Sequence, residues 1–319
     1  MPKSAKQTTL RSHVAVFGIG VHSGLSATLT LHPADADTGI TFLRAATADR
    51  PEREIRADVR AVTATEFATV LGDSSGPLCS TAEHLLAALR GLGVDNALVE
   101  IDGAEVPIMD GSAQPFVDAI DQVGLTTLNA PRRCIEVLKP IRVAIGNGVG
   151  ELRPYAHGFR VESDIEFPGK VIGKQSFAID VDPASFRREL AKARTFGFMR
   201  DVAKLWSSGY ALGASFENTL VVTDDGVLNP AGLRYPDEFV RHKALDAIGD
   251  LALAGAPLLG LYRSQRGGHR LNYTVLSALM ADKTAWRLID MPAPAGRRAT
   301  GHADAVPGLV APAYSPEVS

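Results

Sequence analysis

The sequence predicts an α+β protein with two similar domains, each a mostly antiparallel sheet with two helices. We expect the helices to pack between the sheets, so that each domain is a two-layer sandwich. Three observations support this fold class. The 319 residues suffice for two domains of ordinary size. The order strands, helix, strand, helix occurs twice along the chain, and a polar stretch with a proline, TTLNAPRR (126–133), separates the two runs.

The first predicted domain covers residues 1–128. Its expected elements are, in order, a β-hairpin over 14–30, short strands between 40 and 70, a helix over 80–93, a strand over 96–103 and a helix within 107–124. The first helix, STAEHLLAALRGLG, begins at a serine that can cap it and ends at Gly91 or Gly93. The second, in PIMDGSAQPFVDAIDQVG, has Asp110 or Ser112 as its cap.

The second predicted domain covers residues 129–295. Strands are expected in CIEVLKPIRVAI and GFRVESDIEF, and helices over 182–193, 199–209, 238–253 and 271–288. The remaining residues, 296–319, form a tail rich in Ala, Pro and Gly that we expect to be loose.

Composition excludes several classes of protein. The net charge is −3 and the pI is near 6.2, which excludes a general binder of nucleic acid or membrane surfaces. Cys79 and Cys134 lie far apart without CxxC spacing, so we expect neither a zinc–thiolate site nor a disulfide framework. The N-terminus lacks the apolar core of a signal peptide, and the longest apolar run, 251–262, is too short to span a bilayer. We therefore expect a cytoplasmic monomer with no nucleic-acid partner and no stable membrane insertion.

One predicted helix, EFVRHKALDAIGD (238–250), places Glu238, His242 and Asp246 four residues apart on one stripe. His242 and Asp246 are about 40° apart around the helix axis. The apolar residues that lie roughly opposite and must face the core are Val240, Ala244, Ala247, Ile248 and Leu251. The stripe therefore faces solvent or a cleft. It is either a solvated surface with a Glu238–His242 pair or a partial metal site.

Two further histidines are candidates for such a site. His84 lies in the first turn of the helix over 80–93, where partial positive charge favours the neutral imidazole that a metal needs. Its neighbour Glu83 either belongs to a Ser80–Glu83 capping box or is a functional carboxylate. His269 follows a Gly pair between a strand and a helix, and a lone loop histidine is more often a surface residue than a catalyst.

Five segments spread over most of the chain carry a family resemblance. They are GIGVHSG, STAEHLLAALRGLGVDNALVEIDGAEVPIMDGSAQPFV, ARTFGFMRD, LNPAGLRYPDEFVRHKALDAIGDL and GGHRLN. In order and spacing they resemble the UDP-3-O-acyl-N-acetylglucosamine deacetylases of lipid A biosynthesis. The resemblance implies a cytoplasmic hydrolase of a Gram-negative bacterium that acts on UDP-3-O-(3-hydroxyacyl)-N-acetylglucosamine. It would remove the N-acetyl group, giving acetate and the free amine, as the committed step of lipid A synthesis.

The resemblance also implies one catalytic Zn²⁺, or alternatively Fe²⁺, per chain. His84 from the first domain and His242 and Asp246 from the second would hold this ion and leave a position open for water. The active site would therefore lie at the domain interface.

Four further residues receive catalytic roles from the resemblance. Glu83 would be the general base that takes a proton from the attacking water. Thr195, in the ARTFGF match, would share the oxyanion charge. His269 would protonate the departing amine, and Asp250 would keep its ring charged.

The same comparison assigns substrate contacts. Lys243 and Arg266 would meet the UDP diphosphate, while Glu166 and Phe167 would meet the uridine, with Phe167 stacked on uracil. Phe167 is alternatively an ordinary core residue at a strand end. An insert near 195–217 would form an apolar passage for the acyl chain, lined by Phe196, Phe198, Leu205, Trp206, Tyr210, Leu212 and Phe216. Without the resemblance, that insert is an amphipathic helix and a strand.

Two other functions remain alternatives. A zinc amidohydrolase acting on another acylated amine would keep the metal site and lack the uridine and acyl contacts. A non-enzymatic binder of sugar nucleotide or lipid would use Glu83 only as a cap. The chain also departs from the family pattern over 69–79, which could reshape the loop before Glu83 without touching a ligand, and at Tyr273, with no predictable effect.

Overall fold

The computed structural model describes residues 5–46 and 51–291. The predicted tail over 296–319 therefore lies outside the described residues. The first half of the chain contains these elements: β1 (Lys6–Leu10), β2 (Val14–Ile19), β3 (Ser26–Pro33), β4 (Ile40–Arg44), β5 (Arg53–Arg56), β6 (Val62–Ala64), β7 (Val70–Asp73), β8 (Gly76–Cys79), α1 (Glu83–Leu92), β9 (Ala97–Ile101), α2 (Gln114–Val123) and β10 (Leu125–Pro131).

The second half follows a similar order and adds several short elements. It contains β11 (Arg133–Val137), β12 (Ile141–Ile145), β13 (Gly148–Arg153), β14 (Phe159–Glu166), β15 (Lys174–Asp180), α3 (Pro183–Glu189), β16 (Phe196–Phe198), α4 (Val202–Ser207), β17 (Leu220–Val222), α5 (Glu238–Ala252), β18 (Leu258–Gln265), α6 (His269–Ala281) and β19 (Trp286–Asp290).

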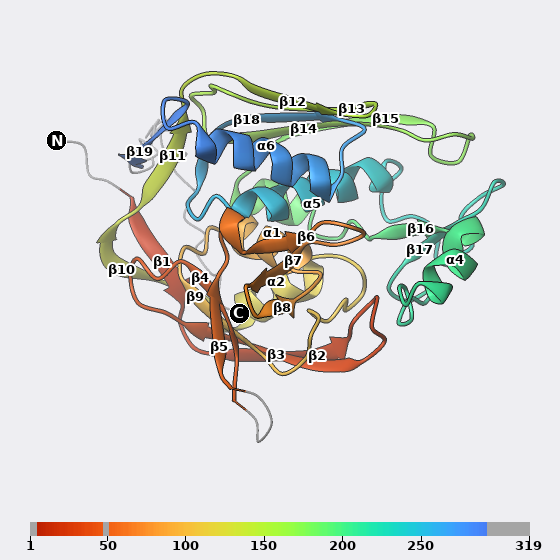
Figure 1. Cartoon of the computed structure of the whole chain (residues 1–319), viewed down its shortest axis with the longest axis horizontal. Coiled ribbons are helices and arrows are strands. Elements are labelled where there is room, and N and C mark those ends of the chain that lie inside the picture. The colour runs from red at the N-terminus through yellow and green to blue at the C-terminus, as the bar shows by residue number, and fades with distance from the viewer. Residues whose placement is uncertain (1–4, 47–50, 292–319) are drawn as a thin grey trace, which may run out of the picture.

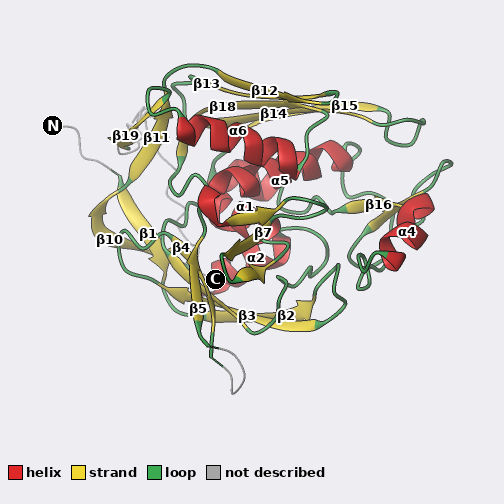
Figure 2. Ribbon diagram, viewed as in Figure 1, coloured by secondary structure: helices red, strands yellow, loops and turns green. Residues whose placement is uncertain are grey.

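Two larger sheets enclose the main helices. One sheet has five strands in the order β2-β3-β9-β4-β5, and the other has seven strands built around β18. Helices α1, α2, α5 and α6 lie between these sheets, so the predicted α+β fold with helices packed between the sheets is confirmed (Figures 1 and 2). Most strand pairs are antiparallel, and β4–β9, β11–β18 and β14–β18 are parallel exceptions within the larger sheets.

The helices α1 and α5 cross closely at a glycine. A Cβ atom added to Gly249 would lie 2.0 Å from the carbonyl oxygen of Glu83, so only glycine permits this approach. Around the crossing, Leu85 and Leu89 of α1 and Leu245 and Ile248 of α5 belong to one buried cluster. Because this cluster includes residues of both large sheets, it joins the two halves of the chain.

Helix α5 is buried on nearly all sides, which corrects one expectation. The apolar side is buried as predicted, and so are Glu238, His242 and Asp246. Glu238 does not pair with His242; its carboxylate binds the Arg194 guanidinium at 2.8 Å, and Arg194 is itself buried. The stripe is therefore not a solvated surface, because packing between the sheets covers both sides of the helix.

Two segments differ from the predicted secondary structure because tertiary pairing overrides local pattern. The helix expected over 271–288 ends at Ala281, and residues 286–290 form β19, which pairs antiparallel with β11. The polar stretch placed at the domain boundary is largely β10, which pairs antiparallel with β1. The division at residue 128 falls inside this strand, and we retain the two-domain division as a proposal.

The expected helix caps are partly wrong. Helix α1 has Ala82 at its N-cap position with no side-chain cap, so Ser80 and Glu83 do not form a capping box. Helix α2 likewise has Ala113 at the N-cap position, although the Ser112 hydroxyl accepts a hydrogen bond from the Gln114 N–H at 3.2 Å. Gly93 does end α1, with the positive φ of 79° that glycine tolerates.

The expected insert projects from one end of the molecule. It comprises β16, the short helix α4 and the chain leading to β17 (Figure 1). Only residues 202–207 of the expected helix over 199–209 are α-helical, after a 3₁₀ turn over 199–201. Within the described part of the chain, every helix is too short or too polar to span a bilayer.

The close crossing of α1 and α5 generates a stability prediction. We expect Gly249→Ala to destabilise the protein by about 1–3 kcal/mol, because the added methyl group meets backbone and must push the helices apart. Urea denaturation measures the change. Gly226→Ala is the matched control, since a Cβ at that position meets nothing within 4 Å. Equal stability of the two variants would contradict the close approach.

Candidate metal centre and catalytic site

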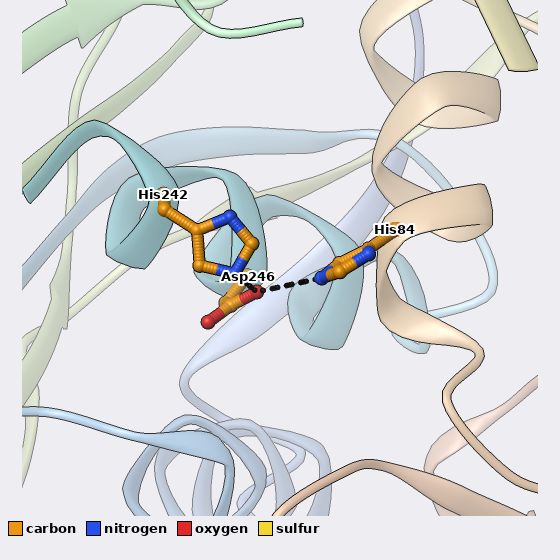
Figure 3. A group of neighbouring side chains, drawn as sticks. All are labelled: His84, His242 and Asp246. Carbon is orange, nitrogen blue, oxygen red and sulfur yellow. Dashed lines mark ion pairs between the residues drawn. The ribbon is translucent and has the colours of Figure 1, made fainter. Parts of the chain in front are cut away.

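Three buried side chains from two helices converge on one point. His84 comes from the first turn of α1, and His242 and Asp246 come from successive turns of α5 (Figure 3). The Nε2 atoms of His84 and His242 lie 3.5 and 3.2 Å from Asp246 Oδ1. One ligand atom from each residue lies within 4.8 Å of the other two.

This geometry fits a tetrahedral metal ion. With ligand bonds of about 2.0–2.1 Å, neighbouring ligand atoms of such an ion are roughly 3.3 Å apart. The two measured separations, 3.5 and 3.2 Å, bracket that value. Asp246 Oδ1 is buried without a hydrogen-bond donor, which is costly unless a cation compensates it. His242 Nδ1 lies 3.1 Å from the Ala193 carbonyl oxygen, and that bond leaves Nε2 free as the ligand.

The electrostatics favour the ligand forms of these groups. Burial lowers the pKa of His242 to about 3, so its imidazole is neutral. Burial opposes ionisation of Asp246, yet the Lys243 ammonium holds the pKa of this carboxyl well below its usual value. The Lys243 Nζ lies 3.0 Å from Asp246 Oδ2, leaving Oδ1 for a metal. A neutral imidazole and an ionised carboxylate are the forms that bind metal.

A second cluster lies beside these three candidate ligands. His269 Nδ1 is 2.9 Å from Asp250 Oδ2, and His269 Nε2 is 3.7 Å from Glu83 Oε1. Burial alone would lower the pKa of His269, but Asp250 and Glu83 raise it to about 10. Burial also raises the pKa of Glu83. The cluster therefore pairs a cationic imidazole with a carboxyl whose affinity for a proton is increased, a combination suited to acid–base chemistry.

Sequence reasoning missed the residues that support this second cluster. Thr69 donates its N–H to Glu83 Oε2 at 3.0 Å and its hydroxyl to Asp250 Oδ1 at 2.6 Å. Asn272 donates to Asp250 Oδ2 at 2.8 Å, and the Tyr262 hydroxyl donates to Asn272 at 2.6 Å. Asn272 lies within the GGHRLN segment, which is a signal that could have found it. Thr69 lies in the stretch 69–79 that departs from the family pattern, so nothing in the sequence marks it.

The structure places Thr195 close to the metal group. It lies two residues after Ala193, whose carbonyl contacts His242, and its own N–H donates to the Gly111 carbonyl at 2.8 Å. Phe196 follows, with its ring centroid 6.3 Å from that of His242, and the Lys243 ammonium lies 5.4 Å from the centroid of the same ring.

Phe167 packs into an aromatic group with residues of the insert. Its ring centroid lies 5.8 Å from that of Phe196 and 5.5 Å from that of Phe198. Phe216 is 49% exposed, and Trp206 and Leu212 of the same insert are 57% and 54% exposed. The insert therefore presents apolar side chains to solvent, where an apolar ligand could cover them, and its residue Phe196 lies beside His242.

A small cavity of about 250 Å³ contains the two predicted polar contacts Glu166 and Arg266. These residues form an ion pair with each other, and Lys174 pairs with Glu166 at 3.2 Å. Arg266 Nη2 and Lys174 Nζ therefore place positive charge at this cavity, beside the strand that ends at Glu166, the residue before Phe167.

The GIGVHSG loop is held by one buried carboxylate that sequence reasoning did not single out. Glu105 accepts the N–H groups of His22 at 2.9 Å and Ser23 at 2.8 Å, and the Thr81 hydroxyl at 2.9 Å. The loop in turn binds the insert, since the Leu212 N–H donates to the His22 carbonyl at 3.1 Å. Glu105 therefore links the start of α1 to the insert.

Comparisons with known proteins identify a family. A family model described as UDP-3-O-acyl N-acetylglycosamine deacetylase matches residues 7–281. Proteins named UDP-3-O-acyl-N-acetylglucosamine deacetylase from Brucella ovis and Brucella canis are each 51% identical over 288 residues, which cover 90% of this chain and 99% of theirs. The protein of the same name from Brucella melitensis biotype 2 is 50% identical with the same coverage.

The position of Thr69 generates a prediction about the second cluster. We expect Thr69→Val to cost about 1–3 kcal/mol of unfolding free energy, because the buried carboxylate of Asp250 loses a hydroxyl donor. Thr69→Ser keeps that hydroxyl and is the matched control. Urea denaturation of both variants measures the difference, and similar losses for Val and Ser would show that the hydroxyl is not the source of the stability.

Proposed function

Because the chain belongs to the UDP-3-O-acyl-N-acetylglucosamine deacetylase family, we propose that the two buried clusters form one metal-dependent active site. The chain is a deacetylase that removes the N-acetyl group of this UDP-sugar lipid and releases acetate, the committed step of lipid A synthesis. The observation that carries the active-site proposal is the convergence of His84, His242 and Asp246 beside the Glu83–His269 pair.

The ion would be Zn²⁺, or alternatively Fe²⁺, with one per chain held by His84, His242 and Asp246. When bound, such an ion polarises a carbonyl oxygen and makes water more acidic. Two observations support this assignment. Asp246 Oδ1 is buried without a hydrogen bond and is available to an ion. The bond from His242 Nδ1 to the Ala193 carbonyl fixes the ring so that Nε2 is available as a ligand.

The acid–base steps fall to the second cluster. Glu83 would accept the proton of the attacking water, and its raised pKa increases its affinity for that proton. His269, which Asp250 holds at Nδ1, would donate the proton on Nε2 to the departing amine. The Thr195 hydroxyl would donate a hydrogen bond to the developing oxyanion. Thr69 would keep Glu83 and Asp250 in place by contacting both.

Substrate contacts extend away from this centre in two directions. Lys243 and Arg266 would bind the diphosphate, and Glu166 and Phe167 would bind the uridine beside the small cavity. To bind phosphate oxygens, the Arg266 guanidinium would have to give up part of its ion pair with Glu166.

The insert would bind the acyl chain. Its exposed side chains, with Phe196, Phe198 and Phe216, offer apolar surface near the metal group. Each buried methylene of the chain would contribute about 0.8 kcal/mol to binding.

We also propose that the enzyme works in the cytoplasm as a monomer. The free buried thiols of Cys79 and Cys134 are consistent with a reducing compartment, where thiols persist.

The metal proposal predicts the outcome of ligand removal. We expect purified protein to carry about one divalent ion per chain, and His84→Ala, His242→Ala and Asp246→Ala each to lose it, because two remaining ligands do not make a stable site. Elemental analysis by mass spectrometry measures the metal content. His157→Ala, at an exposed position, should keep the ion. Retention of the full metal content by any of the three ligand variants would remove that residue from the site.

The general-base role predicts a separation of activity from stability. Glu83→Gln should keep the metal and the fold but lower kcat for the UDP-sugar lipid by about 10²–10⁴-fold, since the amide cannot accept the proton. Metal analysis, thermal unfolding and a deacetylation assay on one preparation test this. Glu54→Gln, at an exposed position, is the matched control. A Glu83→Gln enzyme with wild-type turnover would refute the role.

A further inference from the structure

A larger cavity lies at the opposite ends of the helices that carry the catalytic clusters. Its volume is about 730 Å³, within the usual range of small-molecule sites. It is lined by Arg90 from the last turn of α1, Met280 from the last turn of α6 and residues that follow α5. Along α6, a rise of ~1.5 Å per residue places Met280 about 17 Å from His269. The cavity is therefore distinct from the proposed active site.

The walls of this cavity carry an excess of positive charge. Six basic residues line it, namely Arg56, Arg60, Arg90, Arg132, Arg133 and Lys283, against three acidic residues, Asp37, Asp58 and Asp95. The whole chain has a net charge of −3, so this excess is local. Because the basic residues outnumber the acidic ones, the cavity has a net positive charge that attracts anions.

Each of the three acidic residues is already paired. Arg60 binds Asp58 at 2.6 Å, Arg132 binds Asp95 at 2.8 Å, and Arg133 contacts Asp37 at 3.3 Å. Among the described residues, these pairs leave Arg56 and Arg90 without a direct carboxylate partner. The Lys283 ammonium lies over the Trp286 ring at 4.8 Å rather than against an acid.

The buried polar atoms at the cavity also lack partners. Arg90 Nε and Nη1, Trp286 Nε1 and Ser277 Oγ are buried and make no hydrogen bond in the described part of the chain. All four can donate hydrogen bonds, and all three residues line this cavity. Burial lowers the pKa of Arg90 to about 10, so its charge is poorly solvated. Arg90, Ser277 and Trp286 therefore offer unpaired donors to a ligand with several acceptor oxygens in this cavity.

The remaining walls are apolar. Leu253, Met280 and Leu288 line the same cavity beside the Trp286 ring. Guanidinium groups bind phosphate oxygens in pairs, and apolar walls favour a ligand that is not phosphate alone.

We propose that this cavity is a binding site for a phosphate-bearing small molecule with an apolar substituent, held by Arg90 and Arg56 and seated against Trp286. The site does not depend on the proposed metal chemistry. It contacts the far ends of α1 and α6, whose near ends carry Glu83, His84 and His269.

Tryptophan NMR tests the proposal on the full-length, metal-loaded protein. The chain has two tryptophans, Trp286 in the cavity and Trp206, which is 57% exposed on α4. With ¹⁵N-labelled tryptophan, each indole N–H gives one signal, and Trp206→Phe assigns them. Inorganic phosphate and phenyl phosphate are titrated at constant ionic strength against sodium chloride. We expect saturable movement of the Trp286 signal with a steady Trp206 signal, and tighter binding of phenyl phosphate than of phosphate.

Matched variants identify the groups responsible. Arg90→Gln should weaken binding of phenyl phosphate about tenfold or more, because a hydrogen bond to a charged group is lost. Arg56→Gln removes a second positive charge, at an exposed position on the cavity wall. This variant tests the proposal even if Arg90→Gln perturbs folding. Arg142→Gln, on β12 away from the cavity, is the control for net charge and should bind as the wild type does.

Three results would overturn the proposal. They are a Trp286 signal that follows ionic strength alone, equal binding of phosphate and phenyl phosphate, and wild-type affinity in both Arg90→Gln and Arg56→Gln. Binding of either probe at the proposed active site would leave the Trp286 signal unchanged. Failure here is therefore distinguishable from failure of the proposed function.

Discussion

The proposed catalytic site depends on how closely two helices cross. His84 is on α1, His242 and Asp246 are on α5, and their ligand atoms converge only because the helices touch at Gly249. A side chain at Gly249 would meet the carbonyl of Glu83, the residue next to His84. Packing of the two large sheets against these helices maintains the crossing. The same packing that forms the fold therefore also positions the proposed metal ligands.

The crossing concentrates ionisable groups that would be unfavourable if they were buried singly. Glu83, Asp246 and Asp250 are each at most 2% exposed. Each carboxylate has a compensating partner: His269 of α6 for Asp250, Thr69 before β7 for Glu83, and Lys243 of the same helix for Asp246. Buried carboxylates require such partners, and Asp246 Oδ1, which accepts no hydrogen bond, is where we propose that a cation binds.

Helices α1 and α6 have different kinds of side chain at their two ends. The near ends of α1 and α6 carry carboxylates and histidines, and the far ends line a cavity rich in arginine. Basic side chains near a helix C-terminus are favoured by its partial negative charge, which explains part of this distribution. The helix dipole does not account for buried donors without acceptors at Arg90, Ser277 and Trp286.

The sequence alone determined the α+β class, the main helices and the identity of the candidate ligands, because these follow from local period and from motifs such as STAEHL and FVRHKALD. Only the tertiary structure decided how those residues are used. The His242 stripe is compatible locally with a solvated face, and burial between two sheets removes that alternative. Likewise Glu83 has the spacing of a cap, yet its carboxylate accepts from Thr69, fourteen positions earlier. Thr69, Glu105 and the strand over 286–290 were unpredictable for one reason: their partners are distant in sequence, and pairing at a distance leaves no local pattern.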